Sequence, residues 1–388
     1  MIGTTIGGFE LIEVLGQGGM AVVYKAHQKS LDRMVAVKVL SKNLSFSPDE
    51  IQRFRNEAQA AAQLKHSGIV QVYEAGSANG VHFIAMEYIQ GTSVARWLQQ
   101  QTRLTEANAI IIAESVAHAL QHAWEKACLI HRDIKPDNIL VDADGTVKVA
   151  DLGLASVGHR ASGSTPEDQI LATPNYCSPE QAAGDPLLDV RSDIYSLGAM
   201  LVHLLTGKLP FEGLPPAQIL EQQVKGHLDD PRTTVPGLSA PLCMMIRKML
   251  AKDRKHRYAD WTALLTDLVA VKARRKPAQP LPLSARSTLK NYMPHKGSTS
   301  TATTGHAPAK AGTKTALKKV SSPSSQPPVG LVVTAILAAI VIAITVFVLA
   351  GRSRPRTIRD DRRTINRPDS ATQTTTYDFG DGSWSTKP

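Results

Sequence analysis

A short polar run in the middle of the chain combines the groups that phosphoryl transfer requires. The run His-Arg-Asp-Ile-Lys-Pro-Asp-Asn places a carboxylate at Asp133, an ammonium group at Lys135 and an amide at Asn138. A second carboxylate, Asp151, follows further along the chain beside a glycine. A carboxylate can orient a hydroxyl and accept its proton, while carboxylate and amide oxygens can hold the magnesium that accompanies nucleotide phosphates. The spacing therefore favours phosphoryl transfer over a chance cluster of loop charges.

Two segments near the N-terminus could position a nucleotide against this run. Residues 16–22 read Gly-Gln-Gly-Gly-Met-Ala-Val and lead into a predicted strand, whereas a dinucleotide-binding glycine loop leads into a helix. Lys38 ends a run of small apolar residues on the next predicted strand. A lysine in a strand is more commonly a solvated edge residue, but this apolar run and the spacing from the glycines favour a nucleotide-binding role. Glu57 lies near the buried stripe of a predicted helix, so we expect it to pair with Lys38. Glu50 is a competitor, but its position suits helix capping better.

The hydrophobic pattern is strand-like at first and becomes helical. Strands are expected over residues 9–15, 21–27, 34–40, 69–75 and 81–87. Ser47, Pro48 and Glu50 announce a helix, whose expected buried stripe is Ile51, Phe54, Ala58, Ala61 and Ala62. Further helices are expected over residues 107–126, 193–205, 215–226, 242–250 and 261–272. A small strand-rich lobe followed by a larger helical lobe indicates an α+β fold and not a doubly wound sheet.

Taken together, these segments resemble the protein kinase family. The likeness is carried by H-R-D-x-x-x-x-N at 131–138, D-x-G at 151–153, V-A-V-K at 35–38 and S-P-E at 178–180. Leu152 stands where the family usually has Phe, and Ala21 where it has a third glycine. Residues 9–268 are similar to the bacterial eukaryotic-like (Hanks-type) group. The resemblance implies a bilobal kinase fold, ATP with Mg²⁺ or Mn²⁺ as cofactors, and protein substrates phosphorylated on serine or threonine.

The resemblance also implies roles for individual residues. Asp133 would orient and deprotonate the acceptor hydroxyl, Lys135 would face the transferred phosphate, and Lys38 with Glu57 would complete the catalytic set. Asn138 and Asp151 would bind the metal. The expected ATP-binding residues, with Met86 as gatekeeper, are Leu15, Gly16, Gln17, Gly18, Gly19, Met20, Ala21, Val22, Val23, Ala36, Lys38, Met86, Glu87, Tyr88 and Ile89.

A further set belongs to the activation segment that follows Asp151. The resemblance implies that Arg132 pairs with a phosphorylated residue there, for which the candidates are Thr165, Ser162 and Ser164. Thr173 would shape the surface on which a peptide docks. Structural roles are implied for Glu180, which would pair with Arg257, and for Asp193, which would brace the catalytic loop.

Charge and hydropathy divide the rest of the chain. Residues 1–267 carry 25 Lys and Arg against 29 Asp and Glu, a net of −4, whereas residues 268–388 carry 19 against 5, a net of +14. We therefore expect a kinase domain over 9–270 and a disordered, basic linker rich in Pro, Ser, Thr and Lys over 271–328. Residues 329–350 carry no charge and would span about 33 Å as a helix, enough for a membrane of roughly 30 Å. Residues 351–388 form a short polar tail.

These features predict a single-pass membrane protein whose kinase domain faces the cytoplasm, where ATP is found. Three cysteines without paired spacing fit a reduced compartment. Counting positive charges alone would put the C-terminus inside, because more arginines follow the apolar stretch than lysines precede it. A re-entrant or interfacial helix therefore stays open as an alternative.

Rival interpretations also stay open. A pseudokinase scaffold would recruit partners at the membrane without catalysis, and a small-molecule phosphotransferase would share the fold. The complete motif set argues against the first and the activation segment against the second. A second Asp-Phe-Gly at 378–380 has no catalytic loop beside it and is interpreted as coincidence. The expected partners are protein substrates and the lipid bilayer, with a homodimer as an option and without nucleic acid. Because the tail is only 38 residues long, we expect it to lack the PASTA repeats with which similar kinases bind cell-wall fragments.

Overall fold

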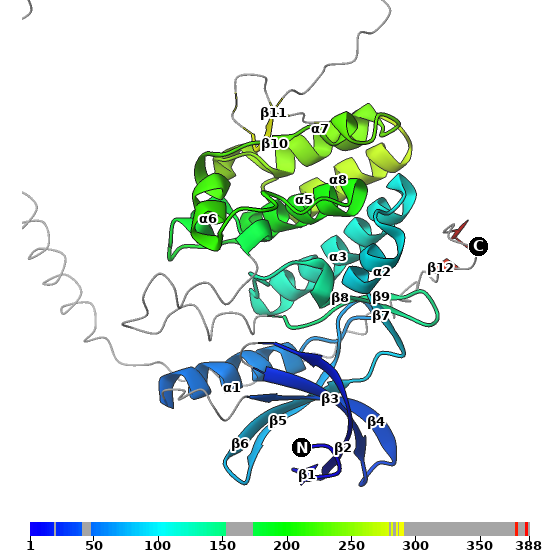
Figure 1. The fold of residues 1–388 in the computed structure, drawn as a ribbon, viewed down its shortest axis with the longest axis vertical. Helices are drawn as coiled ribbons and strands as arrows, with labels where there is room; N and C mark the ends of the chain where they lie inside the picture. Colours follow the sequence, from blue (N-terminus) through cyan, green and yellow to red (C-terminus); the bar gives the residue numbers. More distant parts are fainter. Residues whose placement is uncertain are drawn as a thin grey trace, which may run out of the picture. The chain divides into compact units, whose positions relative to one another are not determined.

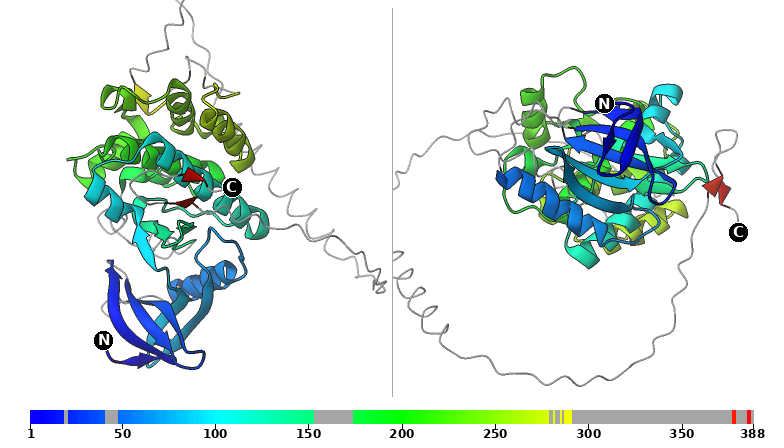
Figure 2. Two further views of the ribbon diagram at one scale, coloured as in Figure 1. Left: turned by 90° about the vertical axis from the view of Figure 1, so that its right-hand side faces the viewer. Right: turned by 90° about the horizontal axis from the view of Figure 1, so that it is seen from below.

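The computed structural model of the chain describes residues 1–18, 21–40, 48–152, 174–278, 281, 285, 287–290, 377–378 and 385–386. Most of them form a strand-rich lobe, here called the N-lobe (residues 1–87), and a helical lobe, the C-lobe (residues 91–290) (Figures 1 and 2). The prediction of two lobes in an α+β fold is therefore confirmed. Near the end of the chain, β12 (Tyr377–Asp378) and β13 (Ser385–Thr386) pair in antiparallel fashion.

The N-lobe is built on one antiparallel sheet. Its strand order is β1-β2-β3-β4-β6-β5. The single long helix of its described part, α1 (Pro48–Ala62), lies against one face of the sheet (Figure 1). The strands are β1 (Thr5–Ile6), β2 (Phe9–Gln17), β3 (Ala21–Gln28), β4 (Arg33–Leu40), β5 (Val72–Ala78) and β6 (Val81–Glu87).

Side-chain alternation along β4 decides what each face of the sheet does. Val35, Val37 and Val39 belong to a buried cluster on one face. Ala36 and Leu40 belong to a second cluster, shared with Phe54 and Ala58 of α1. Because successive side chains of a strand point to opposite faces, Lys38 lies on the α1 face with Ala36 and Leu40. The sheet thus directs this lysine toward the helix and the C-lobe.

The stripe predicted for α1 is buried in its central part. Phe54, Ala58 and Ala61 are at most 4% exposed, while Ile51 and Ala62 are half-buried. Ser47, the predicted cap, and the side chain of Glu50 lie outside the described residues.

The C-lobe follows as a succession of helices with short strands between them. Its elements are β7 (Gly91–Ser93), α2 (Val94–Gln101), α3 (Glu106–Ala127), η1 (Pro136–Asn138), β8 (Ile139–Asp142), β9 (Val147–Val149), η4 (Pro174–Tyr176), α4 (Pro179–Ala182), α5 (Val190–Thr206), α6 (Pro216–Lys225), β10 (Leu228–Asp229), η5 (Pro231–Thr233), α7 (Ala240–Met249), η6 (Arg254–His256), α8 (Trp261–Lys272) and β11 (Leu289–Lys290). They enclose one core, centred on α3, α5, α7 and α8.

Local signals set the ends of the central helices. Thr105 caps α3 by accepting a hydrogen bond from the N–H of Asn108, and Asp189 caps α5 by accepting one from Arg191. Gly207 ends α5 in the left-handed conformation, at a point where the Thr102 carbonyl would clash with a Cβ. Glycine is therefore required there for both its backbone conformation and its size.

The β8–β9 hairpin joins the two lobes. Val149 donates to the carbonyl of Gly68 at 2.8 Å, and Val70 donates to the carbonyl of Val149 at 3.0 Å. These bonds attach the N-lobe segment before β5 to the strand that leads into Asp151. They also explain why β5 begins at Val72, three residues later than predicted: Ile69 forms an isolated parallel bridge with Val149 instead.

Beyond α8, the chain packs back onto the C-lobe where we expected a linker. Leu281, Ser287, Thr288 and Leu289 are each at most 5% exposed. The average composition of residues 271–328 hides these few buriable side chains, so their packing could not be predicted from the sequence. The remainder of the predicted linker, the apolar stretch at 329–350 and most of the tail lie outside the described residues.

Within the described residues, no helix has both the length and the hydropathy that crossing a bilayer would demand.

Candidate functional site

A buried carboxylate fixes the backbone that leads into Asp133. Asp193, in α5, is 1% exposed. Its Oδ2 accepts a hydrogen bond from the N–H of His131 at 2.7 Å, and its Oδ1 accepts one from Arg132 at 2.8 Å. Burial raises the pKa of Asp193, opposed by the nearby His131 ring and by these two N–H groups. The contact matters because Arg132 has a φ of 69°, a conformation that non-glycine residues rarely adopt without support.

Lys135 and Asn138 converge on the carboxylate of Asp133. The Lys135 ammonium lies 2.7 Å from Asp133 Oδ2. The amide nitrogen of Asn138 donates to the same oxygen at 3.1 Å and to the Asp133 carbonyl at 2.8 Å. Two donors on one oxygen hold the carboxylate in a single orientation. The run singled out in the sequence is thus assembled in space as one cluster.

His131 links this cluster to the segment that carries Asp151. Its Nδ1 accepts from the N–H of Asp133 at 3.3 Å, and its Nε2 lies 3.0 Å from the carbonyl of Ala150. An accepting Nδ1 together with a carbonyl partner requires the tautomer in which Nε2 carries the proton. The fully buried ring therefore connects the backbones of residues 133 and 150. Sequence reasoning assigned His131 no role of its own; its place beside Arg132 and Asp133 was the available signal.

Lys38 reaches across from the N-lobe to Asp151. Its Nζ lies 2.8 Å from Asp151 Oδ2. Burial alone would raise the pKa of Asp151, but the charge and hydrogen bond of Lys38 more than offset it, so the pKa lies below its ordinary value. Asp151 has a φ of 56°, the same uncommon conformation as Arg132. Glu57, the predicted partner of Lys38, lies in α1, and its side chain is outside the described residues.

The donor set of Asn138 and Asp151 fits a magnesium ion. Mg²⁺ prefers oxygen ligands and is commonly held by one or two carboxylates together with the phosphates of a substrate. Asp151 is held ionised by its environment. The amide nitrogen of Asn138 is turned toward Asp133, which leaves its oxygen as the metal-binding atom.

The predicted ATP-binding residues fall into two groups in the structure. Ala21, Val23, Ala36, Met86 and Ile89 share one apolar cluster on the α1 face of the sheet. Val22 packs into the cluster on the opposite face. Because side chains alternate along β3, Val22 could contribute only its backbone to a nucleotide on the α1 face.

The same apolar cluster contains two residues that the sequence did not single out. Leu140 of β8 and Ala150 pack against it from the C-lobe. Together with Ala36 and Val23 they form an apolar surface of the kind that a planar base requires. The available signal was the alternation of β8, which lay in a segment too short to be predicted as a strand.

The glycine-rich segment, residues 16–22, is described in part. Gly18 donates to the carbonyl of Ala21 at 2.9 Å, which closes the turn between β2 and β3. Leu15, Gly16 and Gln17 are exposed at the end of β2, and Gly19 and Met20 lie outside the described residues.

Lys148 of β9 holds Glu87, the last residue of β6, in place. Its Nζ lies 3.0 Å from Glu87 Oε1, while the N–H of Glu87 donates to the carbonyl of Gln71. The next residue, Tyr88, lies under the ammonium of Lys25, 4.9 Å from its ring centroid.

The activation segment is described only at its end. Thr165, Ser162, Ser164 and Thr173 lie outside the described residues. Beyond them, Gln181 donates from its side chain to the carbonyl of Arg132 at 2.8 Å. This bond brings α4 beside the catalytic loop.

Glu180 and Arg257 form a buried ion pair below the same region. The two guanidinium nitrogens Nη1 and Nη2 lie 2.6 and 2.7 Å from the two carboxylate oxygens. The other three N–H groups of Arg257 donate to the carbonyls of Ala251, Arg191 and Lys252, so all five donors are engaged. Burial would raise the pKa of Glu180, but Arg257 and the Ser192 hydroxyl lower it overall.

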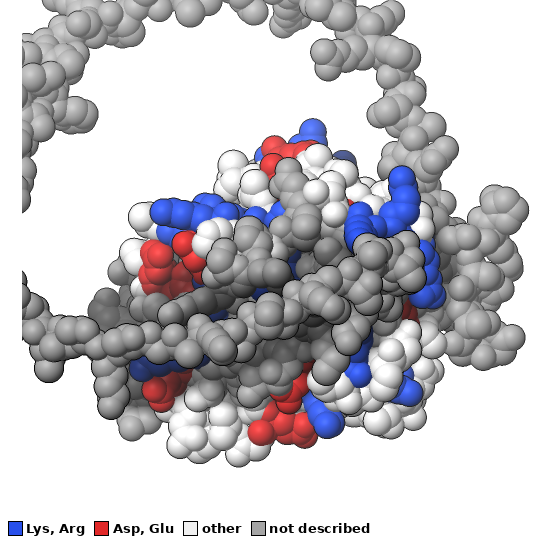
Figure 3. Space-filling view, turned by 90° about the horizontal axis from the view of Figure 1, so that it is seen from above, with Lys and Arg blue, Asp and Glu red and all other residues white. Residues whose placement is uncertain are grey.

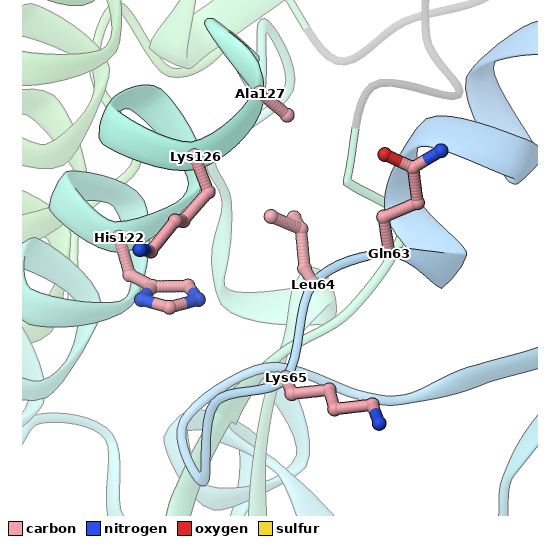
Figure 4. A pocket seen from close by; sticks show the side chains of 6 residues that line it. All are labelled: Gln63, Leu64, Lys65, His122, Lys126 and Ala127. Carbon is pink, nitrogen blue, oxygen red and sulfur yellow. The ribbon is translucent and has the colours of Figure 1, made fainter. Parts of the chain in front are cut away.

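Away from the Asp133 cluster, a hollow lies between the ends of α1 and α3. Its volume is about 340 Å³, and its lining residues are Gln63, Leu64, Lys65, His122, Lys126 and Ala127 (Figure 4). The Lys65 side chain points away from the others (Figure 4). The lining carries no carboxylate or hydroxyl that could orient an acceptor, so phosphoryl transfer is assigned to the Asp133 cluster.

Comparison with known proteins gives consistent matches. The family described as "Protein kinase domain" matches residues 9–269. The serine/threonine-protein kinase PknB of Mycobacterium tuberculosis is 39% identical over 277 residues, which are 70% of this chain and 44% of that protein. The serine/threonine-protein kinase PrkC of Bacillus subtilis is 37% identical over 259 residues, 66% of this chain and 40% of that protein. The chain thus spans less than half the length of these relatives.

Solved structures show the same fold. A crystal structure of the Mycobacterium tuberculosis PknI kinase domain superimposes with a TM-score of 0.54 at 25% identity and covers 69% of this chain and 98% of that one. Another crystal structure of the same domain gives a TM-score of 0.56 at 25% identity, covering 70% of this chain and 98% of that one.

Proposed function

The chain belongs to the protein kinase family, and on that basis we propose that it is a serine/threonine kinase that transfers the γ-phosphate of ATP to protein hydroxyls. The observation that carries this proposal is the Asp133 cluster. One carboxylate oxygen is held by Lys135 and Asn138 at 2.7 and 3.1 Å. Such an oriented carboxylate suits a group that aligns a hydroxyl and takes its proton in the transition state.

The surrounding residues support the remaining parts of the reaction. A magnesium ion held by Asn138 and Asp151 would neutralise charge on the phosphates when bound. Lys38 lies within reach of the same region and would face the α- and β-phosphates, with Glu57 as its partner in the catalytic state. Lys135, beside Asp133, would stabilise charge on the transferred group. The apolar cluster around Ala36 and Leu140 would take the adenine.

Specificity for serine and threonine rests on the resemblance at Lys135 and on the relatives named above. The pseudokinase alternative is disfavoured by the presence together of Lys38, Asp133, Asn138 and Asp151, the residues that transfer itself would need.

The test is phosphate transfer by the full chain in detergent micelles. Incubation with γ-labelled ATP and Mg²⁺ should label the chain itself or a generic basic protein, on serine and threonine only. Mapping the labelled residues should find Thr165, Ser162 or Ser164. Arg132 would then form an ion pair with the phosphorylated residue. Label on tyrosine would contradict the specificity. Nucleotide binding without any transfer would favour the scaffold.

We also propose that residues 329–350 tether the kinase domain to a membrane as one helix, with the domain in the cytoplasm. Their length and lack of charge support this proposal. The full chain should remain with membranes after washing with carbonate or high salt, whereas a chain lacking residues 329–388 should be released. Release of the full chain by salt alone would favour an interfacial helix instead.

A further inference from the structure

A segment beyond the last helix is fastened to the C-lobe through both backbone and side chains. We call residues 287–289 the strap. Thr288 donates its N–H to the carbonyl of Leu250 at 2.8 Å, and its own carbonyl accepts from Leu228 at 2.5 Å. Leu289 is 4% exposed and belongs to the main C-lobe core. The short parallel pair of β10 with β11 continues this attachment.

Arg247 and Ser287 reinforce the strap from the side of α7. The hydroxyl of Ser287 donates to the carbonyl of Arg247 at 2.7 Å, and Arg247 Nη1 donates to the carbonyl of Leu281 at 3.0 Å. Figure 3 shows this end of the molecule, where basic and acidic side chains are interspersed on the described surface. The strap is therefore held by buried hydrogen bonds and apolar contact.

The side chain of Thr288 begins a series of hydrogen bonds that leads into the C-lobe. Its Oγ1 lies 2.9 Å from the hydroxyl of Tyr195, which lies 2.7 Å from Gln223 Oε1. All three residues are at most 1% exposed. Burial raises the pKa of Tyr195, so its hydroxyl stays protonated and donates to Gln223. Thr288 must then donate to Tyr195, so both hydrogen bonds of the series are donated in the direction of Gln223.

This series of hydrogen bonds ends on the backbone that follows the activation segment. Gln223 Nε2 donates to the carbonyl of Asn175 at 2.6 Å and to that of Pro174 at 3.0 Å. Both amide protons are thereby used, and the Tyr195 hydroxyl prevents the amide from turning over. Residues 174–175 come directly after Thr173, and Gln181 attaches the same region to the catalytic loop. Burial raises the pKa of the Cys177 thiol, and the nearby Asp133 carboxylate adds to the rise, so this backbone runs close to Asp133. A peptide that placed its hydroxyl at Asp133 would therefore lie near residues 174–177.

We propose that Thr288 is a positioning residue for the protein substrate, acting through Tyr195 and Gln223 on the backbone at Pro174 and Asn175. This inference rests on the proposed kinase function for its catalytic consequence. Its structural part does not: the strap either restrains residues 174–175 or it does not, whatever reaction the chain performs. The strap thus makes a segment outside the expected kinase domain part of the substrate-docking surface.

The test compares Thr288→Val, which keeps the volume and removes the hydroxyl, with Thr288→Ser, which keeps the hydroxyl. Amide hydrogen exchange is measured on the full chain in detergent micelles. In Thr288→Val, loss of one hydrogen bond of the series should speed amide exchange at residues 175–178 by about two- to tenfold. Thr288→Ser should behave like the unaltered protein.

Two controls separate positioning from general loosening. Thr266→Val removes a hydroxyl that bonds only within α8, and it should leave exchange at residues 175–178 unchanged. Tyr195→Phe should reproduce the effect of Thr288→Val. The double variant should add nothing further, because either substitution alone already interrupts the series of hydrogen bonds.

Kinetics supply the catalytic readout. With a peptide substrate, Thr288→Val should raise the KM for the peptide by a similar factor, without changing kcat or the KM for ATP. Unchanged exchange at 175–178, or an equal rise throughout the C-lobe, would overturn the inference. If the unaltered chain transfers no phosphate, the proposed function fails, while the exchange measurement still decides the role of the strap.

Discussion

Replacing Asp133 by asparagine is expected to lower kcat for phosphate transfer by about 10²- to 10⁴-fold, the range that a positioned general base contributes. The substitution keeps the size of the side chain and its bond from Asn138, but it removes the negative charge that Lys135 binds at 2.7 Å. The KM for ATP should change little, since in the proposed mechanism Asp133 would face the acceptor hydroxyl and not the nucleotide. Initial rates with labelled ATP and a serine peptide measure both constants.

Asp137→Asn is the matched control for this experiment. It makes the same chemical change in the same loop, on an exposed carboxylate four residues away. It should retain nearly full activity. If both variants lose activity equally, the loss reflects the fold of the loop, and Asp133 does not act as the base. If neither loses activity, the proposed mechanism is wrong.

Replacing Arg257 by methionine is expected to lower the free energy of unfolding of the kinase domain by about 3–5 kcal/mol, the usual cost of leaving one member of a buried ion pair unpaired. Among the described residues, Glu180 would keep the Ser192 hydroxyl, at 2.6 Å, as its one side-chain partner. The carbonyls of Ala251, Arg191 and Lys252 would also each lose a donor. Urea unfolding can be followed through tryptophan fluorescence, to which Trp261, 1% exposed in the folded protein, contributes.

Lys225→Met provides the contrast. Lys225 pairs with Glu221 on the surface of α6, where both side chains are more than half exposed. Exposed pairs of this kind contribute little, so its unfolding midpoint should stay close to that of the unaltered protein. An Arg257→Met protein as stable as Lys225→Met would contradict the role assigned to the buried pair. Adding Glu180→Gln to Arg257→Met should recover part of the loss, because the uncompensated charge is then removed.

The sequence predicted this architecture well where a residue pattern is local. The strand at Val81–Glu87 and the helix at Trp261–Lys272 have the predicted bounds, because each has a clear period and clear ends. The β8–β9 hairpin was missed because strands of four and three residues carry too little periodicity. Long-range contacts such as the bridge of Ile69 to Val149 leave no local pattern either.

The candidate site shows the same division. The spacing of Asp133, Lys135 and Asn138 predicted the cluster because all three lie on one loop. The bond from Lys38 to Asp151 could not be derived in the same way, since it depends on how the two lobes approach each other. Thr288 was invisible for another reason: it lies in a segment whose composition resembles a linker, and only its contacts identify it.

The bond between Lys38 and Asp151 makes nucleotide binding an exchange instead of a simple addition. In the structure each residue satisfies the other at 2.8 Å, so a phosphate on Lys38 and a cation on Asp151 must both displace an existing partner. Whichever arrives first frees the opposite charge for the second. Such a site favours the two together over either alone, and by linkage the gain in affinity is the same in both directions. If the chain binds ATP as proposed, this one ion pair between the lobes would make it selective for the metal–nucleotide complex.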